Sequence, residues 1–310
     1  MTDSREVSRR RVVAILQALL VAFLWATSWV LIKIGLLEIP PLVFAGLRYF
    51  LAFIILLMVF LAGTRGKSEP VLPPRMWLRV MIFGLLMYTV AQGAMFTALS
   101  YLPAVTLNLL MNFTTLGVAL LSVAWLAEKP TVLQWAGIAL SLAGAIVYFY
   151  PAAIPRAQMW GLLAALVCIC ANVIATLVGR QMNSARQVPP LQITLVSMGA
   201  GSVALLGAGL LVDGMPSISL RSWLYILWLA AVNTAFAFTL WNHTLRTLTA
   251  AESSISTGTM LIWIPILAVL FLDEHLAPQG ILGLVAVGVG TLLVQLRGGR
   301  ASGADLAVGE

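Results

Sequence analysis

Ten apolar stretches, each of about twenty residues, dominate this 310-residue sequence. The hydrocarbon core of a bilayer is about 30 Å thick, and a helix needs about 20 residues to cross it. The stretches lie approximately at residues 12–35, 40–63, 76–99, 103–126, 131–150, 157–180, 189–212, 221–247, 251–272 and 278–296. Because backbone amides inside lipid must be paired within their own segment, we expect each stretch to be a helix. The sequence therefore predicts an all-α integral membrane protein with ten transmembrane helices.

The composition excludes a water-soluble fold. Hydrophobic residues make up 61% of the chain and charged residues only 9%, whereas a typical soluble domain has about 25% charged residues. A net charge of +7 would suggest a nucleic-acid partner in a soluble protein. Here the basic residues lie in short connections between the apolar stretches, where they act as topology signals. We therefore expect the lipid bilayer, and no nucleic acid, as a partner.

The positions of lysine and arginine predict the orientation of the chain. When the N-terminus is placed in the cytoplasm, only Lys33, Arg156 and Arg221 fall on the outer side, and Arg48 lies within the second stretch. The other lysines and arginines all fall on the cytoplasmic side. Because cytoplasmic loops carry an excess of basic residues, we expect both termini in the cytoplasm.

The second half of the sequence matches the first. A shift of 146 residues aligns Trp77 with Trp223, Glu128 with Glu274, Gly137 with Gly283, and Gly144 with Gly290. Each half has five stretches, an odd number, so the second half must enter the membrane in the opposite sense. Such inverted repeats are typical of secondary transporters, whose substrate site lies near the midplane where the repeats meet. We predict one repeat at residues 1–150, an inverted repeat at 151–297 and a cytoplasmic tail at 298–310, which together form one functional unit.

Several segments resemble the EamA unit, which characterises the drug/metabolite transporter superfamily. EKPTVLQWAGIALSLAGAIVYF and DEHLAPQGILGLVAVGVGTLLVQ are similar to its closing helix, and WATSW and PPLVFAGLRY to its opening helices. The resemblance covers nearly the whole chain and implies a multi-pass transporter of a bacterial inner membrane. The size, the aromatic content and the N-terminal half resemble the YddG-type exporters of aromatic amino acids. Neighbouring members of the superfamily export threonine, homoserine, cysteine metabolites or drugs.

This resemblance implies export of small amphiphilic metabolites, above all aromatic amino acids, by alternating access through a central cavity between the repeats. Export of other amino acids of the threonine or homoserine type, or of drugs and lipid-like compounds, remains an alternative. A non-transporting receptor or scaffold is a further alternative and would bind without flux. An enzyme would need convergent His, Asp, Glu, Cys or Ser residues, and we expect neither an enzyme nor a cofactor or metal. We expect a monomer.

Polar residues of the third, fourth, eighth and ninth stretches are the first candidates for a substrate site. Side chains four residues apart share a helix face, as Tyr88 and Gln92 do, and as Asn108 and Asn112 do on a face that we expect to include Tyr101. The candidates are Tyr88, Gln92, Tyr101, Asn108, Asn112, Asn242, Ser254 and Thr257. The alternative is that such residues hydrogen-bond between helices, each contributing about 0.6 kcal/mol.

Aromatic residues are the second group of candidates. Trp25 lies near the middle of the first stretch, whereas membrane tryptophans usually lie at the interfaces. We expect a pocket lined by aromatic rings, which would bind a bulky or aromatic substrate by stacking. Its residues are Trp25, Tyr88, Tyr101, Phe238 and Trp263. The alternative is that these rings pack in the core or face lipid.

Charged residues within the membrane mark functional positions. Arg48 lies roughly 12 Å into the second stretch, where it could cap carbonyl groups at helix ends or attract a substrate carboxylate. Lys33 is nearer the outer interface, and its side chain could extend to the headgroups. Glu128 and Glu274 precede the last helix of each repeat, and we expect them to satisfy free amides at helix starts.

The acidic residues all lie in termini, loops or helix ends. Proton or sodium coupling usually places a carboxylate at mid-membrane, so the sequence predicts passive or weakly coupled export. His243, near the cytoplasmic end of the eighth stretch, is the one residue that could relay a proton.

Glycine and proline predict how the helices pack and bend. Gly137 and Gly144, like Gly283 and Gly290, are seven residues apart on one face, and they should let the fifth and tenth helices approach their neighbours closely. Pro265 should kink the ninth helix. Its repeat counterpart is Ala119, so we expect this kink, a possible gate, to have no equivalent in the first half.

Overall fold

The computed structural model describes residues 2–63, 74–126, 131–150, 155–184, 190–245 and 247–298. Within these ranges the regular structure is helical, without strands. Ten segments are long and apolar enough to cross a membrane: Arg11–Gly35, Pro41–Gly63, Met76–Tyr101, Ala104–Leu121, Val132–Phe149, Arg156–Gly179, Leu191–Asp213, Leu220–Thr244, Glu252–Phe271 and Pro278–Gln295. We number these spans one to ten. The predicted all-α fold with ten spans is confirmed, because each predicted stretch overlaps the span of the same number.

Four of the spans are divided, whereas the others consist of one long helix. The long helices are α1 (Thr2–Gly35), α2 (Pro41–Gly63), α7 (Val132–Phe149), α8 (Met159–Ser184, after the 3₁₀ turn η2, Arg156–Gln158), α9 (Pro190–Asp213) and α14 (Pro278–Gly298). The third span comprises α3 (Pro74–Gly84), η1 (Leu85–Ala91) and α4 (Gln92–Tyr101), and the fourth comprises α5 (Ala104–Met111) and α6 (Phe113–Leu126). The eighth comprises α10 (Leu220–Ala230), η3 (Ala231–Phe236) and α11 (Ala237–Thr244), and the ninth comprises α12 (Ala250–Gly258) and α13 (Met260–Phe271).

The helices form two compact units, and each unit draws on both halves of the sequence. The first unit contains Met1–Val30, Ala104–Pro155 and Ala237–Glu310. The second contains Leu31–Pro103 and Arg156–Phe236. The fifth and tenth spans therefore belong to the first unit, and the second and seventh spans belong to the second.

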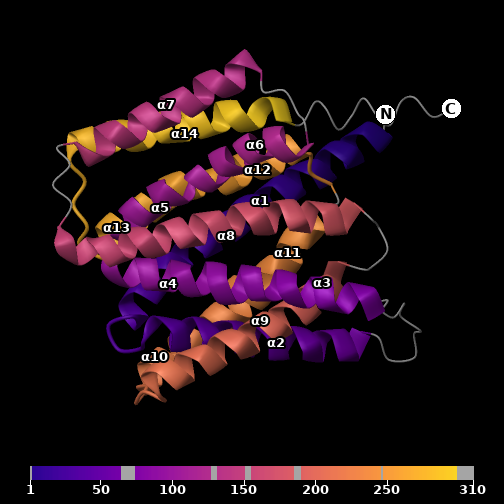
Figure 1. The fold of residues 1–310 in the computed structure, drawn as a ribbon. Coiled ribbons are helices and arrows are strands. Elements are labelled where there is room, and N and C mark those ends of the chain that lie inside the picture. Colours follow the sequence, from indigo (N-terminus) through magenta and orange to yellow (C-terminus); the bar gives the residue numbers. More distant parts are fainter. Residues whose placement is uncertain are drawn as a thin grey trace. The chain divides into compact units, whose positions relative to one another are not determined.

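In the first unit, α7 and α14 lie side by side along their length (Figure 1). Gly137 faces Gly290, and Gly144 faces Gly283, so the two helices run antiparallel. A Cβ atom built on Gly144 would lie 2.8 Å from the carbonyl oxygen of Gly283, and one on Gly137 would lie 2.6 Å from that of Gly290. The sequence prediction of close approach at these glycines is confirmed, and the partner of each helix is the other.

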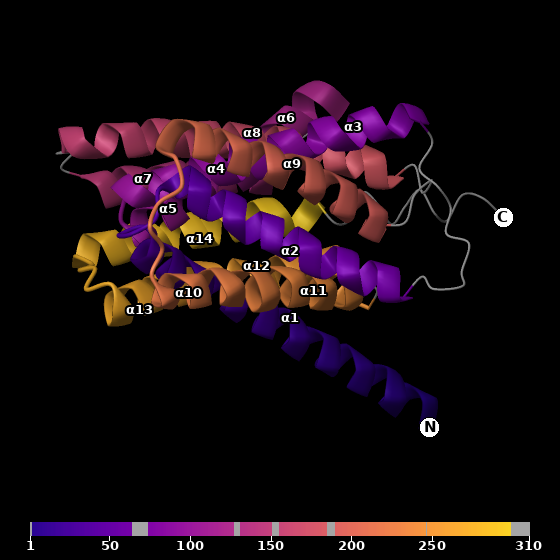
Figure 2. The same cartoon turned by 90° about the horizontal axis from the view of Figure 1, so that it is seen from below.

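In the second unit, α2 and α9 also pack closely against each other at glycines (Figure 2). A Cβ atom on Gly46 would lie 2.6 Å from the Cα atom of Leu206, and one on Gly209 would lie 2.7 Å from the backbone nitrogen of Val43. The second and seventh spans are repeat counterparts, as the fifth and tenth are. Each unit is therefore built around one closely packed pair of equivalent helices.

One expectation about an individual position was wrong. Tyr101 ends α4 and so belongs to the third span, not to the fourth with Asn108 and Asn112, and its side chain is 47% exposed. The ninth span is interrupted at Thr259, and Pro265 lies inside α13, so the kink expected at Pro265 stays a prediction. The turn after residue 101 lies between α4 and α5, since Pro103 has no N–H to continue α4.

Candidate functional site

The third and eighth spans each contain a π-helical turn at the same position of the repeat. These turns are η1 and η3, and the 146-residue shift places Leu85, the first residue of η1, on Ala231, the first residue of η3. Short π-helical segments inside α-helices are frequent at functional sites. Tyr88 lies within η1, Gln92 follows it directly, and Phe238 lies just after η3. Three of the predicted site residues are therefore placed by these turns.

The fourth and ninth spans are also interrupted, at positions that agree within one residue, since the 146-residue shift places Asn112 on Gly258, next to Thr259. In the fourth span the break lies at Asn112, whose backbone N–H donates to Leu109 O at 3.2 Å, and whose side-chain Nδ2 donates to Asn108 O at 2.8 Å. In the ninth span the break lies at Thr259, whose N–H donates to Ser256 O at 3.3 Å. Broken helices at membrane depth are tolerated where the freed backbone lies inside protein or lines water. The four irregular spans are the four in which the polar candidates were predicted.

In the first unit, aromatic rings meet beside the middle of the first span. The ring centroid of Trp25 lies 5.6 Å from that of Phe238 and 5.5 Å from that of Trp241. All three side chains are half-buried. Trp263 contacts Phe23 instead, edge to face at 5.2 Å. Two of the five rings expected to line one pocket, Trp25 and Phe238, are thus in contact within one unit.

The polar candidates of the first unit differ in the hydrogen-bond partners of their side chains. Asn108 is 5% exposed, and its Nδ2 has no hydrogen-bond partner among the described residues. The Thr257 hydroxyl donates to carbonyl groups of its own helix at 3.1 Å. Such bonds often bend helices, and they leave the hydroxyl proton unavailable to a substrate. Asn242 is exposed and Ser254 half-buried. Asn108 is therefore the candidate with an unsatisfied buried donor.

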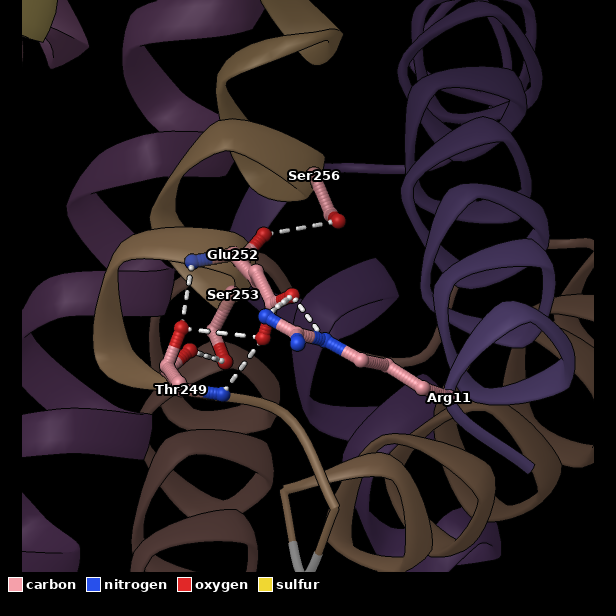
Figure 3. A network of polar contacts seen from close by, with 5 residues as sticks. All are labelled: Arg11, Thr249, Glu252, Ser253 and Ser256. Carbon is pink, nitrogen blue, oxygen red and sulfur yellow. Dashed lines mark hydrogen bonds and ion pairs between the residues drawn. The ribbon is translucent and has the colours of Figure 1, made fainter. Parts of the chain in front are cut away.

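A polar network that sequence reasoning missed caps the start of α12 (Figure 3). The Thr249 hydroxyl accepts from the Glu252 N–H at 3.3 Å, and Glu252 Oε2 accepts from the Thr249 N–H at 2.9 Å. Arg11 of α1 completes the network, with its Nη2 2.6 Å from Glu252 Oε1. Ser253 and Ser256 bond back to carbonyl groups within the same turn. The sequence T-A-A-E at 249–252 is a capping box and could have revealed it.

In the second unit, a buried polar and aromatic cluster surrounds Arg48. Arg48 is 5% exposed, and its Nε donates to Thr234 Oγ1 at 3.1 Å. The Tyr49 hydroxyl donates to Gln92 Oε1 at 2.8 Å, and its ring lies 5.4 Å from that of Tyr88, edge to face. We call these five residues the Arg48 cluster. The sequence identified Tyr88, Gln92 and Arg48 separately, and the second unit brings all three together.

Two charged residues outside these clusters, Lys33 and Glu274, bond to helix ends. Lys33 Nζ donates to Leu99 O at 2.6 Å and to Leu102 O at 2.7 Å, at the end of α4. Glu274 accepts from the N–H groups of Ala104 at 2.5 Å and of Val105 at 3.0 Å. Glu274 thus satisfies free amides as predicted, but those of α5 rather than of the following helix α14. Glu128 lies outside the described residues.

Glu38 caps a distant helix in the same way, in the second unit. It accepts hydrogen bonds from the Ser222 hydroxyl and from the N–H and hydroxyl of Ser219, at the start of α10. These bonds favour the charged form, and the one from Ser222 contributes most, so the pKa of Glu38 lies below the ordinary value of 4.5.

The predicted site residues thus fall into two groups. Trp25, Phe238, Trp263, Asn108, Asn112, Asn242, Ser254 and Thr257 belong to the first unit, and Tyr88, Gln92 and Tyr101 to the second. Within the described part of the chain, no three His, Cys, Asp or Glu residues are grouped as metal ligands would be. Sequence reasoning missed Tyr49, Thr234 and Trp241 as members of these clusters.

Several known proteins align with most of the chain. The uncharacterized transporter YvbV of Bacillus subtilis is 26% identical over 306 residues, covering 94% of this chain and 96% of its own length. The uncharacterized transporter YoaV of the same species is 24% identical over 284 residues, covering 88% of this chain and 93% of its own. A protein of Escherichia coli named "Probable amino-acid metabolite efflux pump" is 24% identical over 288 residues, with 88% and 91% covered.

The fold also occurs in a solved structure. One crystal structure matches with a TM-score of 0.64 and 19% sequence identity, covering 90% of this chain and 97% of that chain. The EamA-like transporter family matches the sequence twice, over residues 12–150 and again over 159–296. These two matches correspond to the five-span halves that the internal repeat defines. The chain therefore belongs to the EamA-like transporter family, as a membrane transporter with ten spans in two repeats.

Proposed function

We propose that this transporter exports aromatic amino acids across a bacterial inner membrane by alternating access, with both termini in the cytoplasm. The Escherichia coli relative is named as an amino-acid metabolite efflux pump, which supports the amino-acid class of substrate. The working unit in this proposal is a monomer.

The observation that carries the aromatic assignment is the ring cluster of Trp25, Phe238 and Trp241. Its rings are half-buried rather than enclosed, and Trp25 lies near the middle of a span, away from the interfaces. Ring centroids 4.5–7 Å apart in tilted or edge-to-face arrangements attract one another, by about 0.5–1.5 kcal/mol per pair. A substrate ring that joins this cluster would gain contacts of the same kind.

The paired helix irregularities support alternating access. Helices bend most easily where their hydrogen-bond ladder is interrupted, as at π-helical turns. Here η1 and η3 lie at equivalent places in the two repeats, and the breaks at Asn112 and Thr259 lie within one residue of equivalence. Equivalent flexible points in inverted repeats allow the two access states to be related by exchanging the conformations of the repeats.

Export in this proposal runs down the substrate gradient without proton coupling. The three carboxylates of Glu38, Glu252 and Glu274 all bond to backbone N–H groups at helix starts. A carboxylate that relays protons must lose and regain its proton during transport. These carboxylates would lose capping bonds on protonation, so their bonding supports a structural rather than a coupling role.

The test is flux into proteoliposomes of the purified full chain. Labelled phenylalanine and tryptophan are compared with threonine, with and without a pH gradient. We expect saturable uptake of the aromatic substrates that the pH gradient leaves unchanged. Protein-free liposomes serve as the control, and the variant Trp25→Ala tests the contribution of the ring.

Different results of this experiment would contradict different parts of the proposal. Threonine uptake without aromatic uptake would replace the substrate by one of the threonine type. Uptake that requires a proton gradient and disappears in His243→Ala would contradict passive export. Binding without flux of any substrate in the panel would favour a receptor.

A further inference from the structure

Arg48 is a buried charge inside a membrane span. It lies in α2, within the span Pro41–Gly63, and only 5% of it is exposed. Charged groups are costly inside the membrane and occur there where they bind ions, substrates or one another. The physical question is which group compensates the charge of Arg48.

The second unit supplies Arg48 with little compensation. A guanidinium carries five N–H donors, and only its Nε has a partner among the described residues, the hydroxyl of Thr234 at 3.1 Å. That hydroxyl donates its own proton to Leu229 O at 2.8 Å and so presents a lone pair to Arg48. The two terminal amino groups, Nη1 and Nη2, donate to no described residue, and no described carboxylate forms an ion pair with Arg48.

The alternative role for Arg48, capping carbonyl groups at a helix end, is filled by another residue. Lys33 donates to Leu99 O and Leu102 O at the end of α4. Arg48 instead lies against aromatic rings, with its Cζ 5.2 Å from the ring centroid of Tyr49 and 6.0 Å from that of Phe96. Ring faces stabilise a cation only in part, and they leave the terminal amino groups free.

The surroundings of Arg48 are fixed by their own contacts. Tyr49 is held by its hydrogen bond to Gln92 and by the ring of Tyr88. Phe96 packs edge to face against Phe44 at 5.4 Å. Thr234 lies in η3, where its hydroxyl bonds five residues back, as the π-helical turn permits. The guanidinium is therefore oriented before any ligand arrives, which reduces the entropic cost of binding.

We propose that Arg48 binds the carboxylate of the transported substrate through its two free amino groups, with Thr234 as the residue that positions it. Planar carboxylates match the paired donors of a guanidinium, and such charge-assisted bonds are strong where water is excluded. This inference rests on the proposed function for its amino-acid substrate, and it names the group that the site recognises.

The first experiment separates binding from stability with the variant Arg48→Met, which keeps the apolar stem. Ligand-induced changes in Tm of the purified full chain are measured with phenylalanine, and with phenylalaninamide, which has the same ring but no carboxylate. We expect phenylalanine to raise the Tm of the wild type and phenylalaninamide to have little effect. In Arg48→Met we expect phenylalanine affinity to fall about 10- to 100-fold, as loss of charge-assisted bonds implies.

The Tm without ligand distinguishes this role from a structural one. Replacing a buried, poorly compensated charge by an apolar side chain is often neutral or stabilising. We therefore expect ligand-free Arg48→Met to melt at the temperature of the wild type or above it. The matched control is Arg221→Met, since Arg221 is exposed and also lies against a tyrosine ring, 5.5 Å from that of Tyr225. This control should keep wild-type affinity for phenylalanine.

The positioning role of Thr234 is tested by a pair of variants. Thr234→Val keeps the shape of the side chain but removes the hydroxyl, whereas Thr234→Ser restores the hydroxyl. We expect Thr234→Val to raise the KM for phenylalanine several-fold and Thr234→Ser to recover most of the loss. Equal effects of both variants would contradict the positioning role.

The possible results separate this inference from the proposed function. Unchanged phenylalanine affinity in Arg48→Met, or equal binding of phenylalaninamide by the wild type, would overturn the carboxylate site. If the wild type binds and transports threonine but no aromatic substrate, the aromatic assignment fails. Arg48→Met would then still weaken threonine binding at least tenfold if the carboxylate site is correct.

Discussion

Carboxylates in this transporter stabilise helix starts that are distant in the sequence. Glu38 bonds to the start of α10, and Glu274 bonds to the start of α5. The N–H groups of a first helical turn have no partners within the helix, and near a membrane an unpaired amide is costly. These residues therefore act as caps supplied from other parts of the chain, which a local pattern of residues does not reveal.

The cap at Glu38 should make stability depend on pH. Its pKa is lowered in the fold by the Ser222 and Ser219 bonds, so its contribution is present above the ordinary pKa of 4.5 and is lost as the pH falls through the folded value. We expect Glu38→Gln to lower the Tm at pH 7 and to differ less from the wild type below pH 4.5. Asp213→Asn, an exposed change at the end of α9, is the control. A Tm difference for Glu38→Gln that is constant across this pH range would contradict the prediction.

The half-buried ring of Trp25 should matter more for substrate affinity than for folding. We expect Trp25→Ala to raise the KM for phenylalanine about 2- to 10-fold, because ring pairs contribute about 0.5–1.5 kcal/mol beyond area burial. Trp25→Phe should retain most of the affinity. Trp160→Ala removes a tryptophan that is 68% exposed and should leave the KM unchanged. Initial rates of uptake into proteoliposomes give these values, and equal KM values for Trp25→Ala and the wild type would count against the ring cluster.

At the scale of elements, the two repeats share irregular as well as regular features. The π-helical turns η1 and η3 recur at equivalent positions, and the breaks at Asn112 and Thr259 recur within one residue of equivalence. The ninth-span break at Thr259 has a counterpart in the first half and is distinct from the kink predicted at Pro265. A feature that recurs without identical residues depends on the backbone and its packing rather than on one residue type.

The contact between α7 and α14 should tolerate no added side chain. A Cβ on Gly144 would lie 2.8 Å from both Gly283 O and Ala286 Cβ, so Gly144→Ala must separate the helices, at a cost of about 1–3 kcal/mol. Gly207→Ala in α9 meets nothing within 4 Å and should be neutral or stabilising by up to about 1 kcal/mol, since alanine favours helices. Thermal unfolding of the two variants in the same detergent compares them. Similar Tm values for both would show that the helices can separate without cost.

The sequence predicts the spans well because bilayer thickness dictates their length. It also predicts the glycine faces of α7 and α14. Of the five rings expected in one pocket, only Trp25 and Phe238 are in contact with each other among the described ring pairs. It does not predict η1, η3 or the break at Asn112, because these depend on hydrogen-bond spacing that propensity does not encode. The target of Glu274 was missed because α5 begins 170 residues earlier than Glu274. Tyr101 was assigned to the wrong span because the turn at Pro103 separates residues that helical spacing alone would place together.

At the scale of the whole molecule, neither compact unit belongs to one repeat. The first unit needs α5–α7 from the first half and α11–α14 from the second, and the second unit is mixed in the same way. The repeats are thus units of sequence, whereas the compact units are built from both of them. A five-span half therefore lacks part of each unit.

Separated halves should consequently be inactive alone. We expect residues 1–150 or 151–310, expressed singly, to give no phenylalanine flux, and co-expression of the two to restore part of it. The intact chain, expressed at the same level, is the reference. Flux from one half alone, measured after purification without the other, would contradict this dependence.

The bond between Glu274 and the start of α5 also sets an order of events during synthesis. The amides of Ala104 and Val105 emerge from the ribosome long before the carboxylate that accepts their hydrogen bonds. Until Glu274 is translated, the fourth span must rely on water or lipid headgroups for these amides and so should stay near the membrane surface or remain loosely inserted. A residue from the end of the chain therefore completes a helix of its first half, as α14 later completes the pairing with α7, so maturation of the transporter finishes only near the end of translation.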